Sequence, residues 1–366
     1  MQHDKAIRTF FCLLHNATGE TRRLPKNVGP EVWQEVFGLA RMHALIGIAY
    51  SAIEELPREE QPPKDLMLEW AVTTEYIKER NRKMDLATVA VSEKLLKDGF
   101  RSVILKGQGI ARLYPRPEYR TAGDIDIWME GSRERILAYL KQFTQKKAPV
   151  YHHADCILIN GIHIEAHFTP SWMNEYFSNR RLQKFFSDNA DEQFSHRIAL
   201  ADAKGSVCIP TLAFNRIYIL IHIYRHFFQH GIGLRQCLDY CHILKQGFTE
   251  EEKKRTIHTL KRLRLMKFAG AVMYVMQIAF GLENEYLLVQ PNEKEGKILL
   301  NEIMLAGNFG QFDRRIGKID KKAPFRSFCR NVKRNLQFAG SYPAEALCSP
   351  LFKIWHYIWR KSKGWI

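Results

Sequence analysis

The stretch YRTAGDIDIWME, residues 119–130, places Asp124 and Asp126 one residue apart within an apolar run. A carboxylate in such a run is costly to bury unless a cation or hydrogen bonds satisfy it. If the run forms a strand, the two side chains share one face, roughly 6.6–6.8 Å apart along the chain. The pattern therefore predicts a strand with two acids that converge on one site. A solvated pair of acids at a strand end would show the same spacing.

The residues before this strand predict another strand, a tight turn and a short helix. FRSVILKGQG (100–109) is a β-branched run that ends with Lys106 and Gly107 at the turn. A glycine at a strand-to-helix turn lets backbone N–H groups approach a phosphate. GIARLYP (109–115) then suits a short helix that stops at its proline.

The residues after the acidic strand predict a helix and a hairpin. SRERILAYLKQF (132–143) has helical spacing, with Ser132 as its N-cap. APVYHHADCILINGIHIEAHF (148–168) predicts two strands joined by the Asn-Gly pair at 160–161, which is a strong hairpin signal. Residues 100–170 therefore form a small unit in which strands and helices alternate.

Helical periodicity dominates on both sides of this unit. Residues 1–98 read as all-helical, with a long helix from about 65 to 98, and the helical period returns from about residue 210. We predict an α+β fold in three parts. These are an N-terminal helical region (1–98), a core with a small mixed β-sheet (99–205), and a C-terminal helical domain with a basic tail (206–366).

Composition excludes several classes of protein. With 46% hydrophobic and 26% charged residues, the chain reads as globular rather than disordered. The longest apolar run, 268–282, contains Gln277 and is too short to span a bilayer, so it fits a buried helix. The first residues carry charges of both signs and no long apolar run, so we read no signal peptide and expect a cytoplasmic protein.

The seven cysteines are scattered along the chain. An odd number without an export signal favours reduced thiols over a disulfide framework. Cys237 and Cys241 could share a helix face, but no second Cys or His pair lies at ligand spacing. We therefore favour a place in the core over a metal site for these two residues.

The chain is basic, with 55 Lys and Arg against 39 Asp and Glu and a net charge of +16. Residues 311–366 hold 13 basic and 3 acidic residues, a net of +10. Such an excess favours a polyanionic partner: a nucleoside triphosphate, a nucleic acid or an anionic membrane surface. It does not select among them.

The second hairpin strand, GIHIEAHF, could supply a third acid. On a strand, His163, Glu165 and His167 share one face. Glu165 could then bind metal or act as a general base toward a hydroxyl group. A His-Glu-His zinc site and a merely polar, exposed face remain alternatives. Three ligands along one strand would wrap a tetrahedral ion poorly.

These motifs together carry a family resemblance. LKGQGIARLYPRPEYRTAGDIDIWM (105–129), followed by IHIEAHF (162–168), resembles the uncharacterised nucleotidyltransferase family within the DNA polymerase β-like superfamily. That superfamily has a glycine-led turn, an Asp-x-Asp strand and a third acid on a later strand. The match is specific over about 100–170. IHIYRHF and LRQCLDY in the helical part also resemble the family, whereas the first 98 residues match only in general character.

The resemblance implies a nucleotidyltransferase-type sheet and a role for each motif residue. Asp124 and Asp126 would bind Mg²⁺ (or Mn²⁺) that bridges the phosphates of an NTP, and Glu165 would complete the acidic triad. The residues expected at the phosphates are Lys106, Gly107, Gln108 and Arg120. An arginine can pair with phosphate in a bidentate manner, although Arg120 could equally be a surface residue.

The sequence departs from the family pattern at two positions. Gln108 stands where the superfamily usually has glycine or serine, and Glu165 stands where the family more often has aspartate.

Three candidate functions follow from these motifs. The first is Mg²⁺-dependent transfer of an NMP from an NTP to an unknown hydroxyl acceptor (a small molecule, tRNA or a protein), with release of pyrophosphate. The alternatives are a weak or inactive nucleotide-binding regulatory protein, motivated by Gln108, and a nucleic-acid-binding protein that uses the basic C-terminal region.

Two further features of the helical part carry open predictions. His222, His226, Arg235 and Asp239 fall at helical spacings, so they could face the active site or form a buried polar network between helices. The end of the chain, LFKIWHYIWRKSKGWI (351–366), interleaves aromatic and basic residues. It could pack on the domain, contact a membrane or partner, or stack on nucleic acid.

Overall fold

The computed structural model describes residues 2–143, 148–159, 161–200, 205–229, 231–313, 315 and 324–365. Within these residues the centre of the molecule is a sheet of six strands: β1 (Ser102–Ile104), β2 (Ile125–Met129), β3 (His153–Ile157), β4 (His163–His167), β5 (Arg197–Ala199) and β6 (Ser206–Cys208). The strand order is β3-β4-β2-β1-β6-β5. The β1·β6 and β2·β4 pairs are parallel and the others antiparallel, so the sheet is mixed, as predicted.

The two faces of the sheet pack against different helices. One face contributes isoleucines from β1, β2 and β4 to a cluster with α4 (Lys64–Lys97) and α6 (Arg133–Leu140). The opposite face carries Trp128 and packs toward α9 (Leu212–Gln229). Successive strand residues point to opposite faces. Asp126 therefore points to the same side as Trp128.

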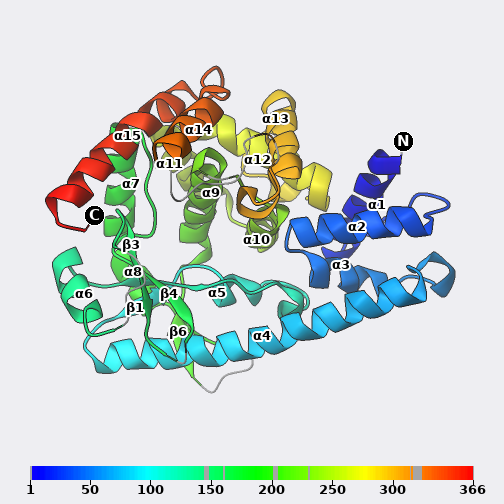
Figure 1. Ribbon diagram of the computed structural model, residues 1–366, viewed down its shortest axis with the longest axis horizontal. Helices are drawn as coiled ribbons and strands as arrows, with labels where there is room; N and C mark the ends of the chain where they lie inside the picture. Colours follow the sequence, from blue (N-terminus) through cyan, green and yellow to red (C-terminus); the bar gives the residue numbers. More distant parts are fainter. Residues whose placement is uncertain are drawn as a thin grey trace.

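The N-terminal part is helical, as predicted. It consists of α1 (Gln2–Ala17), α2 (Pro30–Met42), α3 (Ile46–Ile53) and α4, with a short 3₁₀ turn, η1 (Arg58–Glu60), before α4. Helix α2 begins at a proline, whose fixed φ suits the first helical position. Helix α4 has 34 residues and runs along one side of the molecule, from the N-terminal helices to the sheet (Figure 1). It matches the long helix predicted from about 65 to 98.

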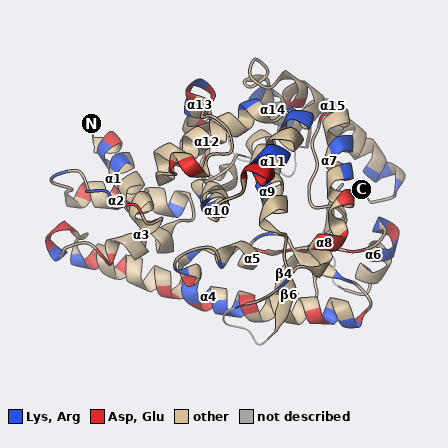
Figure 2. Ribbon diagram, turned by 180° about the vertical axis from the view of Figure 1, so that it is seen from behind, with Lys and Arg blue, Asp and Glu red and all other residues tan. Residues whose placement is uncertain are grey.

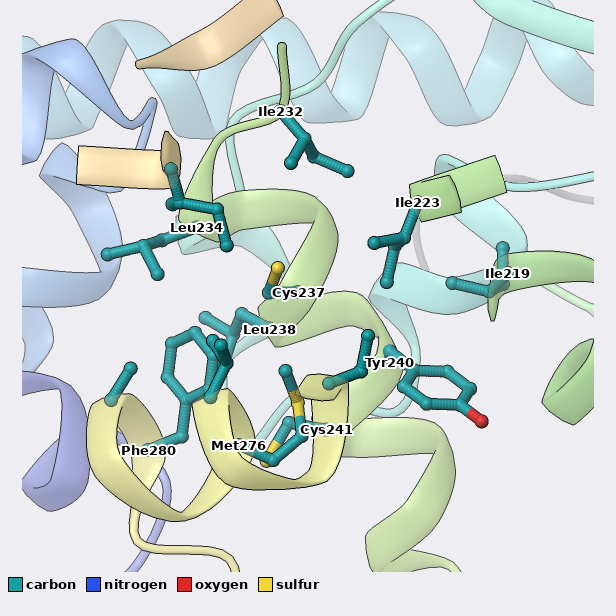
Figure 3. Packing of buried hydrophobic residues seen from close by; sticks show 14 of the residues in the cluster. Ile219, Ile223, Ile232, Leu234, Cys237, Leu238, Tyr240, Cys241, Met276 and Phe280 are labelled. Atoms are coloured by element: carbon teal, nitrogen blue, oxygen red, sulfur yellow. The ribbon is translucent and has the colours of Figure 1, made fainter. Parts of the chain in front are cut away.

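The C-terminal part is helical beyond β6. Its α-helices are α9, α10 (Leu234–Lys245), α11 (Glu250–Arg262), α12 (Met266–Phe280), α13 (Glu293–Ala306), α14 (Pro324–Leu336) and α15 (Pro343–Ser362). The apolar run 268–282 lies largely in α12, which is buried. Cys237 and Cys241 of α10 are fully buried beside Met276 and Phe280 of α12, so the predicted core role is confirmed (Figure 3).

The local predictions around the acidic strand hold in most details. The short helix α5 (Gln108–Ala111) follows β1, and the Ser132 hydroxyl caps α6 by accepting a hydrogen bond from the Arg135 N–H. Strands β3 and β4 are antiparallel, as the hairpin prediction requires. Asn160 of the predicted turn lies outside the described residues.

Several elements were not predicted from the sequence. They are the short strands β5 and β6, and the helices α7 (Tyr176–Asp188) and α8 (Ala190–Ser195) that follow the hairpin. The strands have three residues each, too few for a period of two to stand out. The larger hydrophobic cluster draws residues from both the N-terminal and the C-terminal helices. The predicted boundaries near 98 and 205 stay a prediction.

Candidate active site

The turn after β1 places Lys106 and Gly107 beside the acidic strand. Gly107 has a φ of 63°, a backbone conformation that L side chains rarely adopt, which explains the glycine at this position. Its carbonyl accepts hydrogen bonds from the N–H groups of Ile110 (3.2 Å) and Ala111 (2.9 Å), and so opens α5. The Lys106 Nζ lies 3.1 Å from Asp126 Oδ1.

The two acids of the Asp-x-Asp motif occupy unequal positions. Asp126 lies within β2 and is buried, whereas Asp124 precedes the strand and is exposed. Of the two predicted strand residues, only Asp126 lies in the strand, but both acids line one pocket. Strand pairing with β1 begins at Ile127, and the Leu105 N–H bonds the Asp126 carbonyl at 3.0 Å, so Asp124 is left in the loop.

Side chains from two helices hold the loop that leads to Asp124. The Asn81 amide of α4 donates to the carbonyl oxygens of Glu118 (2.8 Å) and Arg120 (2.7 Å). The Arg235 guanidinium of α10 donates to the Thr121 carbonyl at 2.7 Å. A loop carbonyl that is paired in this way cannot easily move, so both helices position Asp124.

Asp126 and Glu165 are direct neighbours across parallel strands. They are paired residues in the β2·β4 register, and Glu165 is in turn paired with Asp155 of β3. The three acids therefore form one row across the sheet. The His167 Nε2 lies 3.1 Å from Asp126 Oδ1 and 3.5 Å from Glu165 Oε2. His153 Nδ1 approaches the same Glu165 oxygen at 3.5 Å.

The charges of this row and of Asp124 beside it shift one another's pKa values. Asp124 has its pKa raised to about 6, first by the charge of Asp126 and then by burial, while Lys106 opposes the rise. Because Asp124 opens to solvent, we give the Asp126 charge more weight than burial. For Glu165, burial works against ionisation, but the hydrogen bond with His167 lowers the pKa below its usual range.

The histidines divide into charged and neutral members. Burial opposes protonation of His167, but its bonds to Asp126 and Glu165 raise its pKa. Burial lowers the pKa of His153 to about 4, so this ring is neutral near pH 7. A neutral His153 cannot hold Glu165 ionised by its charge. We therefore assign the positive charges beside the row to His167 and Lys106.

A pocket opens beside these residues between the sheet and the C-terminal helices. Six of its lining residues belong to the turn, the loop and β2: Lys106, Gly107, Arg120, Gly123, Asp124 and Asp126. Its other wall is formed by Ile219, His222, Arg235, Gln236, Asp239 and Phe309. Of the four predicted helical residues, His222, Arg235 and Asp239 thus face the site, whereas His226 contacts Arg225 at 3.2 Å.

Arg120 is engaged with an acid as well as lining the pocket. Its Nε and one terminal nitrogen donate to the two oxygens of Asp239 at 2.7 and 2.8 Å, and Tyr114 donates to the same carboxylate at 2.7 Å. Both charged side chains are buried. Asp239 therefore belongs to a buried polar network that joins α10 to the loop before β2 rather than to α9, and the predicted phosphate contact of Arg120 stays a prediction.

The Gln108 side chain points out of this pocket. Its amide donates to Asp85 of α4, and the residue lines a separate surface pocket with Asn81 and Ala111. The side chain of Gln108 therefore does not line the pocket of Lys106 and Asp126, and its predicted place at the phosphates stays a prediction. The first residue of α5 faces the long helix, because the glycine turn directs it there.

The donor atoms of the row fit a divalent cation. Asp126, Glu165 and His167 each offer an atom within 4.8 Å of the others, as do His153, Asp155 and Glu165. Carboxylate oxygens suit Mg²⁺ and Mn²⁺. The repulsion that raises the pKa of Asp124 would be relieved by a cation. His163 instead contacts Asp155 at 3.5 Å and belongs to none of these groups, so the zinc alternative on one strand gains no support.

A model of the family described as "uncharacterised nucleotidyltransferase" matches residues 29–281, which is more than half of the chain. The chain belongs to this family. The suspected resemblance is therefore confirmed, and the matched range contains every residue of the pocket except Phe309. No curated protein matches the chain.

Solved structures similar to this nucleotidyltransferase include CCA-adding enzymes. That of Thermotoga maritima, complexed with tRNA, is 14% identical over 72% of this chain and 77% of its own, with a TM-score of 0.19. A CCA-adding enzyme with CTP is 14% identical over 73% and 76%, with a TM-score of 0.19. One with ATP is 13% identical over 73% and 76%, with a TM-score of 0.18.

The candidate site also contains residues that the sequence motifs do not indicate. His152 and Arg225 lie next to the acidic row, with Arg225 2.6 Å from His152 Nε2 and over the Trp172 ring at 4.3 Å. Both are buried. The tandem His152-His153 pair was a visible signal, but only the β3·β4 pairing brings it beside His167.

Proposed function

We propose that this nucleotidyltransferase moves a nucleoside monophosphate from an NTP to a hydroxyl acceptor, with release of pyrophosphate and with Mg²⁺ or Mn²⁺ as cofactor. One observation carries the proposal. Asp126 is paired in register with Glu165, beside Lys106, Gly107 and Asp124 in one pocket. Converging acids next to a glycine turn suit a metal-assisted reaction of a phosphate ester.

Asp126 and Glu165 would hold the cation from neighbouring strands, and Asp124 would reach it from the loop. The bound ion would neutralise charge on the phosphates. Lys106 and His167 now provide the positive charge beside Asp126, at 3.1 Å each. These cations, together with a bound metal ion, would offset the negative charges of a triphosphate and of the three carboxylates.

The pocket cations would bind and orient the triphosphate. Lys106 comes from the turn, and Arg235 comes from α10 with its Nε free of protein partners. Arg120 has one terminal nitrogen without a partner and could add a contact. Glu165 is ionised near neutral pH and would accept the proton of the acceptor hydroxyl. Because its low pKa makes it a weak base, positioning has to contribute most of the rate.

The test is a labelling assay with the intact protein. Each labelled NTP (ATP, CTP, GTP or UTP) is incubated with protein, Mg²⁺ or Mn²⁺, and a cell extract that supplies the acceptor. We expect Asp126→Asn to lower labelling by at least about 100-fold. The matched variant Asp155→Asn, in the same row but farther from the pocket acids, should lower it by less than about tenfold.

Two outcomes would contradict parts of the proposal. The first outcome is that wild type and the double variant Asp124→Asn, Asp126→Asn give the same labelled products. In that case the proposed nucleotidyl transfer is wrong. If Asp155→Asn is as damaging as Glu165→Gln, the third acid has been assigned to the wrong strand. Circular dichroism and thermal melts of each variant separate loss of chemistry from loss of fold.

A second candidate function is nucleotide binding without turnover. The orientation of Gln108 toward Asp85 favours it, because a side chain that would contact phosphate at this turn in related proteins is turned away here. Calorimetry distinguishes the two candidates. Tight NTP binding in Mg²⁺, with no pyrophosphate released in the presence of extract, would support a regulatory module.

A further inference from the structure

The C-terminal helix α15 presents its apolar side to solvent. Leu347, Leu351, Ile354 and Ile358 follow one another at spacings of four, three and four residues and are 55%, 66%, 48% and 60% exposed. Side chains at these spacings form a single stripe along a helix. Trp355 and Tyr357 flank the stripe and are also exposed. A surface helix of a globular protein normally turns such a stripe inward.

Polar residues hold α15 in this orientation. Glu345 is buried, and its carboxylate accepts hydrogen bonds from the backbone N–H groups of Asn174 (2.8 Å) and Glu175 (3.2 Å). Ser349, one turn later, is buried and accepts a bond from Asn335 at 2.8 Å. These contacts point the side of the helix that carries Glu345 and Ser349, together with the buried Ala346, into the protein, so the apolar stripe on the opposite side faces outward.

The exposed charges of the α14–α15 hairpin itself are all positive. The described range 324–365 contains eight Lys and Arg and a single acid, Glu345, which is buried. Lys361 and Lys363 are exposed at the end of α15, and Arg326 and Lys333 are exposed on α14, which packs beside it (Figures 1 and 2). Phe325 and Leu336 of α14 add exposed apolar area, at 75% and 52%.

We propose that the α14–α15 hairpin docks on an anionic phospholipid bilayer. An apolar stripe bordered by lysines and aromatic rings is the pattern of a helix that lies in the membrane interface. The apolar side chains would enter the acyl boundary, Trp355 and Tyr357 would sit at headgroup level, and the lysines would contact lipid phosphates. Among the described residues no helix has the length and apolarity to cross a membrane, so the contact is peripheral.

Charge and composition favour this occupant over the alternatives. A second copy of the chain would bring two surfaces of the same positive sign together, which is unfavourable. A nucleic acid would use the lysines and some rings, but it would leave the Leu347, Leu351, Ile354 and Ile358 stripe without an apolar partner. Anionic lipid satisfies both features. The hairpin also lies beyond the range matched by the family, which ends at 281.

Vesicle flotation with the full-length protein tests the proposal. We expect the protein to float with vesicles of phosphatidylglycerol and phosphatidylcholine in equal parts. It should bind pure phosphatidylcholine vesicles at least tenfold more weakly, and added salt should weaken the contact. Leu351→Glu combined with Ile358→Glu should weaken binding to the anionic vesicles at least tenfold. Lys361→Gln with Lys363→Gln should weaken it less, but reduce the salt dependence.

A matched variant controls for the new negative charge. Leu68 on α4 is 64% exposed, close to the value for Leu351, and lies far from the hairpin in sequence and on a different helix. Leu68→Glu should bind anionic vesicles as wild type does. All variants should keep the wild-type melting temperature, since the replaced side chains are exposed.

Four results would overturn the proposal. The first is no binding of wild type to anionic vesicles. The second is binding by the Leu351→Glu, Ile358→Glu variant equal to wild type. The third is that wild type is a dimer in light scattering and does not bind vesicles, while the same variant is a monomer. This result would mean that a second copy of the chain covers the stripe. The fourth is that the lysine variant loses binding to tRNA but keeps its binding to vesicles. This result would assign the surface to nucleic acid.

Discussion

At the residue scale, each acid of the site differs from its neighbours in burial and partners. Asp126 is buried between Lys106 and His167, whereas Asp124 is exposed one residue before the strand begins. The hydrogen bond with His167 lowers the pKa of Glu165 against the effect of burial, and the same bond raises the pKa of His167. These differences come from backbone position and contacts, not from residue type. The same principle applies outside the site, at Glu345.

The buried Glu345 should make the protein's stability depend on pH. Burial raises its pKa from 4.5 to about 7, against the lowering effect of the N–H groups of Asn174 and Glu175. Because the folded-state pKa lies above the unfolded value, its unfavourable contribution is full above pH 7 and disappears as the pH falls toward 4.5. The shift corresponds to roughly 3 kcal/mol of unfolding free energy.

Urea denaturation of Glu345→Gln at about pH 5 and about pH 8 measures this effect. Wild type should lose unfolding free energy between the lower and the higher pH because Glu345 becomes ionised. The variant has no such group, so its unfolding free energy should fall less or rise over the same interval. The glutamine side chain has one acceptor oxygen fewer for the backbone N–H groups. This loss should lower the unfolding free energy equally at both pH values. An unchanged pH dependence would show that Glu345 stays ionised in the folded protein.

At the element scale, the loop before β2 is fixed by helices that belong to distant parts of the chain. Helix α4 supplies Asn81, α10 supplies Arg235, and α3 packs against the 3₁₀ turn η2 (Pro117–Tyr119). A Cβ atom on Gly47 of α3 would lie 2.3 Å from the Tyr119 carbonyl oxygen. The helix and the loop thus approach at backbone distance, which only glycine permits.

Gly47→Ala should therefore destabilise the protein by roughly 1–3 kcal/mol or more, because backbone must move to accept the methyl group. We also expect lower labelling activity, since the moved loop carries Asp124. Gly38→Ala on the exposed side of α2 is the control. Nothing lies within 4 Å of its added Cβ, so it should raise stability by up to about 1 kcal/mol.

Thermal and urea unfolding of the two glycine variants measures the difference. A Gly47→Ala protein as stable as Gly38→Ala would show that the α3–loop contact is looser than the structure describes. Normal stability with reduced activity would place the effect in the loop alone.

At the scale of the whole molecule, the sheet and the helical parts are joined by shared cores and by one buried ion pair. The larger hydrophobic cluster contains residues of α1 to α4 and of α9 to α13. The Arg120–Asp239 pair connects the loop before β2 to α10, and both members are buried. An uncompensated charge left in that position would be expensive.

Arg120→Ala should lower the unfolding free energy by about 3–5 kcal/mol, because it leaves the Asp239 carboxylate buried without its cation. Arg116→Ala is the matched control. It removes an arginine from an ion pair with Glu54 and Glu55 that is substantially exposed, so it should cost less than about 1 kcal/mol. Chemical denaturation measures both. If Arg120→Ala keeps its stability but loses activity, Arg120 is a phosphate ligand rather than a connector.

The sequence by itself determined much of the local structure and the motif set. Period-two and period-3.6 patterns predicted β2, the β3–β4 hairpin and the long helix α4, because burial on one face leaves a repeat in the chain. The sequence also indicates Lys106-Gly107, Asp126 and Glu165 as site residues, since their residue types suit phosphate and metal chemistry. β5 and β6, with three residues each, were too short to leave such a pattern.

Only the tertiary structure decided which side chains meet. The β2·β4 register placed Asp126 opposite Glu165, and the β3·β4 pairing added His153 and Asp155. It also joined Arg120 to Asp239, turned Gln108 toward α4, and left the apolar side of α15 outward. Local patterns report how one segment buries its own surface. These contacts depend instead on pairings between residues far apart in the chain, which no single segment encodes.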